Sequence, residues 1–336
     1  MESTLDCPHT FEPPEVAPSG MTPREKFIMA LKGGQPPGIV PTFELVFFLT
    51  EELLGKTHPS HMDWSGWGEK PEKEKEAVRE ECARIYIESA EALGHSAIFL
   101  HQPSSIEDHL RLIQIVREMS GMKYFLMVHG DATYAIPNGQ QYQKFVFRLV
   151  DEPDVVKAEA NNKVDAALER ARQYIDGGLD GFALCADYCF NKGPFLSPPM
   201  FREFITPFLT RLVQGQRQMG AYVIKHTDGD IMPILEDLIE GEPHALHSLD
   251  PQAGVDIREV KELIGDRVCL IGNVDCGLMQ TGTPDEVRQS AEYALEHGMP
   301  GGGCIFSTSN CIYPGLPLER YFLILEVWKE KGWPEQ

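Results

Sequence analysis

Short, wholly apolar runs alternate along the chain with longer segments of mixed polarity. Eight of these runs are predicted strands, and each is followed by a segment with helical patterning. The runs are apolar throughout rather than alternating, which is typical of strands buried on both faces. Alternation of strand and helix predicts parallel strands joined by right-handed crossovers. The predicted strands span residues 39–45, 96–101, 123–129, 181–187, 222–226, 245–250, 268–275 and 303–309.

Helix boundaries carry local signals. Thr22 precedes Pro23 in the pattern of an N-cap and a first helical residue, and Thr283 begins a second capped helix. Eight strand–helix units predict an α/β fold, a single (β/α)8 TIM barrel over residues 21–336. Residues 1–20, which are Pro-rich and acidic, are predicted to form a short N-terminal arm. A doubly wound open sheet is the alternative, but no G-x-G-x-x-G follows the first predicted strand.

Charge and composition limit the partners. The 336 residues include 30 Lys and Arg against 51 Asp and Glu, a formal net charge of −21. Such a surface repels nucleic acid and anionic membranes, so neither is expected as a partner. There is no apolar run of about 18 residues to span a membrane, and the first residues lack the apolar core of a signal peptide. We therefore expect a cytoplasmic protein whose eight cysteines are reduced.

The strongest chemical signal is His226 followed by Asp228 at the end of the fifth predicted strand. Residues i and i+2 of an extended segment share a face, so both side chains can point at one atom. That spacing suits a metal ion or a substrate carbonyl. A hydrogen-bonded His–Asp pair is the alternative explanation.

In a (β/α)8 barrel the active site lies at the C-terminal ends of the strands. Nearly every predicted strand ends in a titratable or hydrogen-bonding side chain, and from these we select catalytic and substrate-binding candidates. The catalytic candidates are His226, Asp228, Tyr188, His101 and His129. The polar substrate-binding candidates are Glu44, Asp187 and Asn273, and an apolar wall is predicted from Phe43, Phe47, Tyr188 and Phe190, for which core packing is the alternative.

A zinc site can also be assembled from these strand ends. Catalytic zinc takes protein ligands from Cys, His and carboxylates and leaves one position open. His226, Asp228 and Cys311 supply three ligands if the fifth and eighth strands face each other, and Asp250 is the nearest acidic candidate for a fourth. In the alternative interpretation Cys311 is packing.

Five segments of the chain are Thr22-Pro-Arg-Glu-Lys-Phe, Gly193-Pro-Phe-Leu-Ser-Pro-Pro-Met-Phe-Arg-Glu-Phe, Lys225-His-Thr-Asp-Gly-Asp-Ile, Leu270-Ile-Gly-Asn-Val-Asp and Cys311-Ile-Tyr-Pro-Gly-Leu-Pro-Leu-Glu-Arg-Tyr. With these segments the chain resembles the uroporphyrinogen decarboxylase superfamily, over roughly Met21 to Trp333, and this resemblance implies a (β/α)8 fold. Metal-free decarboxylases of this superfamily hold a porphyrinogen through arginines near the N-terminus and an Asp after the second strand. This chain has no Arg between Arg24 and Arg79, and its second predicted strand ends in His101. Without those guanidinium groups an acidic protein is a poor host for a polycarboxylate.

The other branch of the superfamily comprises zinc methyltransferases that work with a corrinoid protein. Their pattern is H-x-C followed by a distant Cys; His226 and Cys311 match it, and Asp228 stands where the first Cys would be. Asp is also a zinc ligand, and a harder ligand set favours an oxygen substrate such as a methoxy or ether donor. The resemblance thus implies methyl transfer between a small methylated compound and the cobalt of a corrinoid carried by a partner protein. A metal-free decarboxylase and a non-catalytic ligand-binding subunit remain as alternatives.

Overall fold

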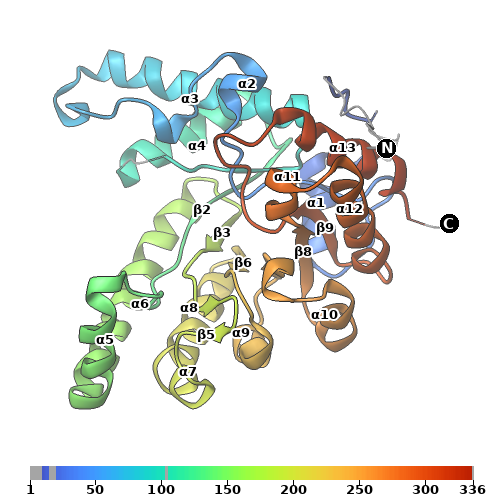
Figure 1. Cartoon of the computed structure of the whole chain (residues 1–336). Helices are drawn as coiled ribbons and strands as arrows, with labels where there is room; N and C mark the ends of the chain where they lie inside the picture. Colours follow the sequence, from blue (N-terminus) through green and yellow to red (C-terminus); the bar gives the residue numbers. More distant parts are fainter. Residues whose placement is uncertain (1–9, 15–19, 103–104, 335–336) are drawn as a thin grey trace.

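The computed structural model describes residues 10–14, 20–102 and 105–334. In this part of the chain seven parallel strands form one curled sheet, in the order β1-β2-β3-β6-β7-β8-β9 (Figure 1). The predicted α/β class with parallel strands is therefore confirmed. The strands are β1 (Ala97–Phe99), β2 (Phe125–His129), β3 (Gly181–Leu184), β6 (Tyr222–His226), β7 (Ala245–His247), β8 (Cys269–Val274) and β9 (Cys304–Thr308).

The first predicted strand, residues 39–45, does not form a strand. Thr42 makes one isolated parallel bridge to Phe306 of β9. The Phe306 N–H donates to the Pro41 carbonyl at 2.9 Å, and the Ser96 N–H donates to the Thr42 carbonyl at 2.7 Å. The segment therefore lies between β9 and the start of β1. Pro41 has no N–H and cannot donate to a ladder, which limits regular pairing there, and the sheet has seven strands instead of the predicted eight.

The two faces of the sheet pack into separate apolar layers. Along β2, Phe125 and Met127 join an interior cluster, whereas Leu126 and Val128 pack toward the helices. Burial on both faces accounts for the continuous apolar runs in the sequence. The helices of the outer layer, drawn around the sheet in Figure 1, are α3 (Glu72–Leu93), α4 (Ile106–Ser120), α6 (Pro153–Asp176), α8 (Thr206–Gln218), α10 (Ile257–Ile264), α12 (Pro284–Gly298) and α13 (Leu318–Lys331).

Helix α1 (Pro23–Leu31) covers the end of the sheet at which the strands begin. Thr22 caps its start, as the sequence predicts, and also forms a reciprocal capping box with Glu25. Phe27 of α1 lies inside the interior cluster, with its ring centroid 4.9 Å from that of Phe125, the first residue of β2. The opposite end, where the strands finish, is therefore the end available for chemistry.

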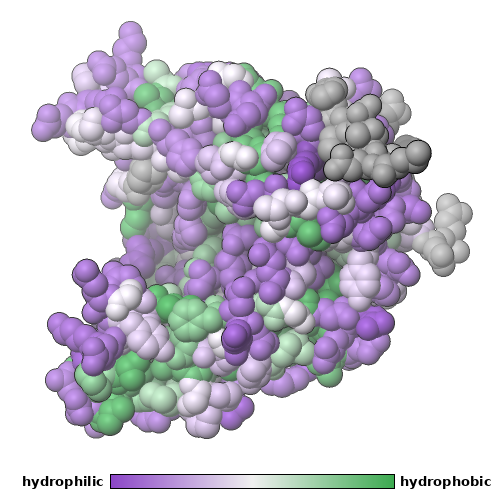
Figure 2. All heavy atoms as spheres, in the orientation of Figure 1, coloured by the Kyte–Doolittle hydropathy of each residue, from purple (hydrophilic) through white to green (hydrophobic). Residues whose placement is uncertain are grey.

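Several elements are absent from the sequence prediction. The helical stretch that precedes β6 is divided at Ile205 into α7 (Pro198–Phe204) and α8, because Pro207 cannot continue a helix. Helix α5 (Gly139–Asp151) packs on α6 and stands out from the body, and the surface is hollowed between α5 and α3 (Figure 2). The other additions are α2 (Thr50–Leu54), η1 (Pro59–His61), η2 (Trp67–Glu69), β4 (Cys189–Phe190), β5 (Gly193–Pro194), η3 (Met232–Ile234), α9 (Leu235–Ile239), η4 (Pro251–Ala253) and α11 (Cys276–Thr281).

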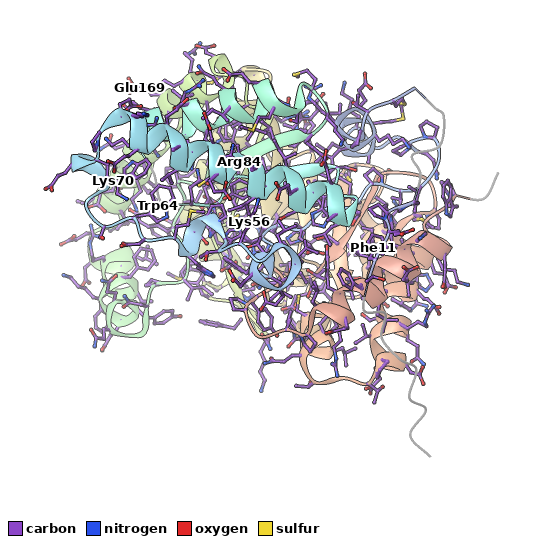
Figure 3. All side chains as sticks on the ribbon, turned by 90° about the horizontal axis from the view of Figure 1, so that it is seen from above. Phe11, Lys56, Trp64, Lys70, Arg84 and Glu169 are labelled. Atoms are coloured by element: carbon purple, nitrogen blue, oxygen red, sulfur yellow. The ribbon has the colours of Figure 1, made fainter. Side chains whose placement is uncertain are left out.

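Residues 10–14 of the predicted N-terminal arm lie against α13. Phe11 stacks on Phe322 with ring centroids 6.3 Å apart, and the Lys329 ammonium donates to the Glu12 carbonyl at 2.9 Å. Figure 3 shows Phe11 beside this helix. Among the described residues, no helix is both long enough and apolar enough to span a membrane.

Candidate functional site

Three side chains from two neighbouring strands converge where those strands end. Asp187 follows β3, His226 ends β6, and Asp228 lies two residues beyond; β6 pairs with β3. His226 Nε2 lies 3.8 Å from an Asp187 oxygen and 3.7 Å from an Asp228 oxygen. One ligand atom from each side chain lies within 4.8 Å of the others. We call this group the Asp187–His226–Asp228 cluster.

His226 is oriented by a second buried histidine. Its Nδ1 lies 2.7 Å from Nδ1 of His247, on the neighbouring strand β7. When the His226 Nδ1–H donates to His247, the His226 Nε2 presents a lone pair to the two carboxylates. Burial, followed by the nearby His247, lowers the pKa of His226 well below its usual range. The imidazole is therefore neutral, which is the form that binds metals.

The carboxylates of the cluster are only partly satisfied by donors. The Asn310 amide donates to Asp228 Oδ2 at 2.6 Å, but among the described residues no donor reaches the buried Asp228 Oδ1. The separations of 3.7 and 3.8 Å to His226 Nε2 are too long for hydrogen bonds. Burial and the neighbouring Asp187 raise the pKa of Asp228 to about 7. Asp187 Oδ1 accepts the Asp228 N–H at 3.3 Å. Two carboxylates and an imidazole lone pair that converge, with Asp228 Oδ1 left without a donor, fit a divalent cation.

A buried ion pair supports the segment that carries Asp187. The fully buried Lys225 ammonium donates to Asp131 Oδ2 at 3.0 Å, to the Leu184 carbonyl at 3.1 Å and to the Ala186 carbonyl at 2.8 Å. Asp131 Oδ2 also accepts the Ala186 N–H at 3.0 Å. The pair ties β6 to the residues just before Asp187. The sequence analysis did not predict this role, although a lysine within an apolar strand indicates a buried charge that needs an acidic partner.

Two of the predicted metal ligands lie outside the cluster. Asp250 caps η4, accepting the Gln252 N–H at 3.0 Å and the Gly229 N–H at 3.2 Å. Cys311 packs against the interior apolar cluster, and burial raises the pKa of its thiol to about 12. Within the described ranges neither side chain belongs to the group held within 4.8 Å. The third member of the cluster is Asp187, which the sequence predicts as a substrate-binding residue.

Glu44 and Asn273, two predicted substrate-binding residues, make internal hydrogen bonds. The buried Glu44 carboxylate accepts from the Thr308 hydroxyl at 2.5 Å and from the Ser307 hydroxyl at 3.3 Å. Burial raises the pKa of Glu44 to about 8. The Asn273 amide donates to the Leu249 carbonyl at 2.8 Å.

The predicted aromatic wall is distributed over separate environments. Phe43 lies in the interior cluster, whereas Phe47 packs against Tyr321 of α13 with ring centroids 5.1 Å apart. Phe190, on β4, is 50% exposed. The buried Tyr188 places its hydroxyl 2.5 Å from the Thr133 hydroxyl.

The remaining catalytic candidates form a pair of their own. His101 follows β1, and His129 ends β2. Their facing ring nitrogens are 2.9 Å apart. Neither is a member of the Asp187–His226–Asp228 cluster.

The family pattern for uroporphyrinogen decarboxylase (URO-D) matches residues 130–330, more than half of the 336 residues. The chain belongs to the URO-D family. This stretch contains all three members of the cluster and the Lys225–Asp131 pair.

Relatives of this chain include enzymes of two kinds. A uroporphyrinogen decarboxylase from Thioalkalivibrio sulfidiphilus is 25% identical over 243 residues, covering 68% of this chain and 64% of that protein. The methylcobamide:CoM methyltransferase MtaA of Methanosarcina barkeri is 27% identical over 224 residues, covering 66% of this chain and 62% of that protein. The chain thus spans less than two thirds of the length of each of these relatives.

Two solved structures are similar to this chain in fold. A methyltransferase from Methanosarcina mazei superimposes with a TM-score of 0.70 at 19% identity, covering 92% of this chain and 99% of that chain. A putative vitamin-B12 independent methionine synthase from Listeria monocytogenes gives a TM-score of 0.52 at 12% identity, covering 88% and 99%. At these identities the similarity concerns the fold alone.

Proposed function

We propose that this protein is a zinc-dependent methyltransferase that moves a methyl group between a small methoxy or ether compound and the cobalt of a corrinoid carried by another protein. The observation that carries the proposal is the buried Asp228 Oδ1, which no described donor reaches and which faces His226 Nε2 at 3.7 Å. The likeness to a methylcobamide:CoM methyltransferase supports the same reaction class.

Asp187, His226 and Asp228 would hold the metal. One imidazole and two carboxylates make three protein ligands, so a fourth position stays open for a substrate atom. Zinc held by these three residues would act as a Lewis acid and would polarise a substrate oxygen at the open position. Cys311 and Asp250 remain predicted ligands that lie outside the cluster.

The chain's own residues prepare this site. His247 holds the His226 ring so that Nε2 faces the carboxylates, and Asn310 fixes one oxygen of Asp228. The Lys225–Asp131 pair secures the backbone just before Asp187. These contacts orient the three ligands before any substrate arrives, which is the usual purpose of hydrogen bonds behind a metal site.

Porphyrinogen decarboxylation is the competing reaction, because decarboxylases are among the relatives. The cluster presents two carboxylates, and the nearby Lys225 ammonium already has three acceptors. Such a site repels a substrate that carries many carboxylates. The other alternative, a non-catalytic ligand-binding subunit, would bind the metal but would not transfer a methyl group.

Elemental analysis combined with a methyl-transfer assay tests the proposal. Purified protein is incubated with methoxylated aromatic compounds and free cob(I)alamin, and methylcobalamin formation is followed by absorbance. We expect about one zinc per chain and transfer that Asp228→Asn abolishes, while the matched Asp154→Asn variant, at an exposed position on α6, retains both. Transfer by metal-free protein would refute the proposed role of zinc, and coproporphyrinogen formation would favour the decarboxylase. Zinc binding without methyl transfer from any donor would support the binding subunit.

A further inference from the structure

A cavity of about 240 Å³ lies at the end of the sheet where the strands begin, opposite the candidate metal site. Two of its lining residues, Ser96 and Tyr124, come directly before β1 and β2. The other walls come from the N-terminal arm at Pro13, from α1, α3 and α13, and from residues 39–41. We call this space the Lys26 cavity, after the lysine that α1 contributes to it.

Most of the wall of the Lys26 cavity is apolar. Ile39, Val40 and Ala90 are buried members of the hydrophobic core, and Trp328 is 3% exposed. The Trp328 indole N–H donates to the Val40 carbonyl at 2.8 Å, so the one polar atom of this ring is already used inside the fold. The cavity therefore favours a ligand with an apolar body.

Lys26 adds a positive charge to this apolar wall. The residue is only 5% exposed, and no described residue accepts a hydrogen bond from its ammonium. Burial lowers the pKa of Lys26, and no nearby carboxylate opposes this effect. Glu91, the acidic residue among the described lining residues, accepts instead from the Lys123 ammonium at 2.9 Å. A buried cation without a partner costs free energy, so an anion bound beside it would be stabilised.

Ser96 supplies a second donor to the same cavity. Its backbone is fully paired, because its N–H donates to the Thr42 carbonyl at 2.7 Å and its carbonyl accepts the Phe125 N–H at 3.1 Å. The residue is 6% exposed, and its hydroxyl makes no hydrogen bond to any described residue. An ammonium and a hydroxyl, with the wall carboxylate already paired, form an anion-binding pair of donors.

The size of the cavity limits the ligand to a small molecule. A protein cavity of about 150 Å³ with apolar walls holds benzene. The Lys26 cavity, at about 240 Å³, has room for one such ring and a carboxylate group.

We propose that the Lys26 cavity binds a small aromatic monocarboxylate, whose ring packs against Val40 and Trp328 and whose carboxylate accepts from the Lys26 ammonium and the Ser96 hydroxyl. The site shares no residue with the Asp187–His226–Asp228 cluster. It is therefore independent of the proposed methyl transfer.

Calorimetric titration of the whole chain with benzoate and with benzamide tests the site. The protein is first treated with a chelator, so that no metal ion can hold the carboxylate. Benzamide has the same ring and nearly the same size as benzoate but carries no charge. We expect benzoate to bind at one site per chain and benzamide to bind about 10- to 100-fold more weakly, since it forms no charge-assisted hydrogen bond with Lys26.

Three variants locate the binding site. Lys26→Met removes the charge while it keeps an unbranched side chain, and it should weaken benzoate binding by the same factor. Lys73→Met, at an exposed position on α3, and Asp228→Asn should bind benzoate as the wild type does. Thermal unfolding checks that Lys26→Met is folded, and the comparison of the two ligands on the wild type needs no variant.

The opposite results are equally clear. Equal affinity for benzoate and benzamide, or no benzoate binding at millimolar concentration, would refute the site. Benzoate binding that is lost in Asp228→Asn and kept in Lys26→Met would assign the carboxylate to the candidate metal site. Methyl transfer reports on the proposed function alone, because Lys26→Met should retain it whether or not benzoate binds.

Discussion

His226 Nδ1 lies 2.7 Å from His247 Nδ1, and this contact decides which nitrogen of His226 faces Asp187 and Asp228. Two Nδ1 atoms at this distance share one proton, so each ring constrains the tautomer of the other. The contact joins β6, which carries His226, to β7, which contributes no residue to the cluster.

His247→Phe should weaken zinc binding without removing a ligand. The variant keeps a ring of similar size but loses the Nδ1 acceptor that orients His226. Loss of such a partner typically lowers metal affinity about 10- to 100-fold. Competition with a chromophoric chelator measures the affinity, and His297→Gln on α12 is the control. Unchanged affinity would mean that His226 adopts its ligating tautomer without His247.

Asp228→Cys should retain zinc and Asp228→Asn should lose it. A thiolate is a good zinc ligand, whereas a neutral amide is a poor one. The Cys variant should nevertheless demethylate an oxygen donor more slowly, because the softer sulfur donates more charge and weakens the Lewis acid. Zinc content and transfer rate are measured for both variants. Equal loss of zinc in the two would mean that Asp228 is not a ligand.

Lys225→Met should cost about 3–5 kcal/mol of unfolding free energy, because it leaves the Asp131 carboxylate buried without its cation. The double variant Lys225→Met, Asp131→Asn should recover part of that loss, since no unpaired charge remains. Urea denaturation of both variants measures the coupling. A single variant that unfolds within about 1 kcal/mol of the wild type would contradict a buried pair.

Glu44 should make stability fall as pH rises. Its pKa is raised from 4.5 to about 8 by burial, so between these values the folded chain holds a proton that the unfolded chain has lost. Unfolding free energy therefore decreases from about pH 4.5 to about pH 8, by roughly 5 kcal/mol for the whole interval, and is level above it. Glu44→Gln should remove this slope in urea denaturation across the pH range. Glu52→Gln, at an exposed position on α2, should preserve it.

Local chemistry alone determined much of the secondary structure. The capping boxes at Thr22 and Thr283 require only residues three positions away, so the starts of α1 and α12 were readable from sequence. Continuous apolar runs predicted buried parallel strands because both faces of such a sheet are covered. The position of His226 and Asp228 at the end of β6 followed from the same pattern.

Only the tertiary structure decided which strand ends meet. Asp187 joins His226 because β3 and β6 are neighbours in the sheet, although residues 185–221 separate the two strands along the chain. Cys311 and Asp250 lie outside the cluster. Register and sheet order arise from packing of distant segments, so no local pattern specifies them. The same holds for the segment at Thr42, where an apolar run with strand-like composition makes a single bridge because Pro41 interrupts the ladder.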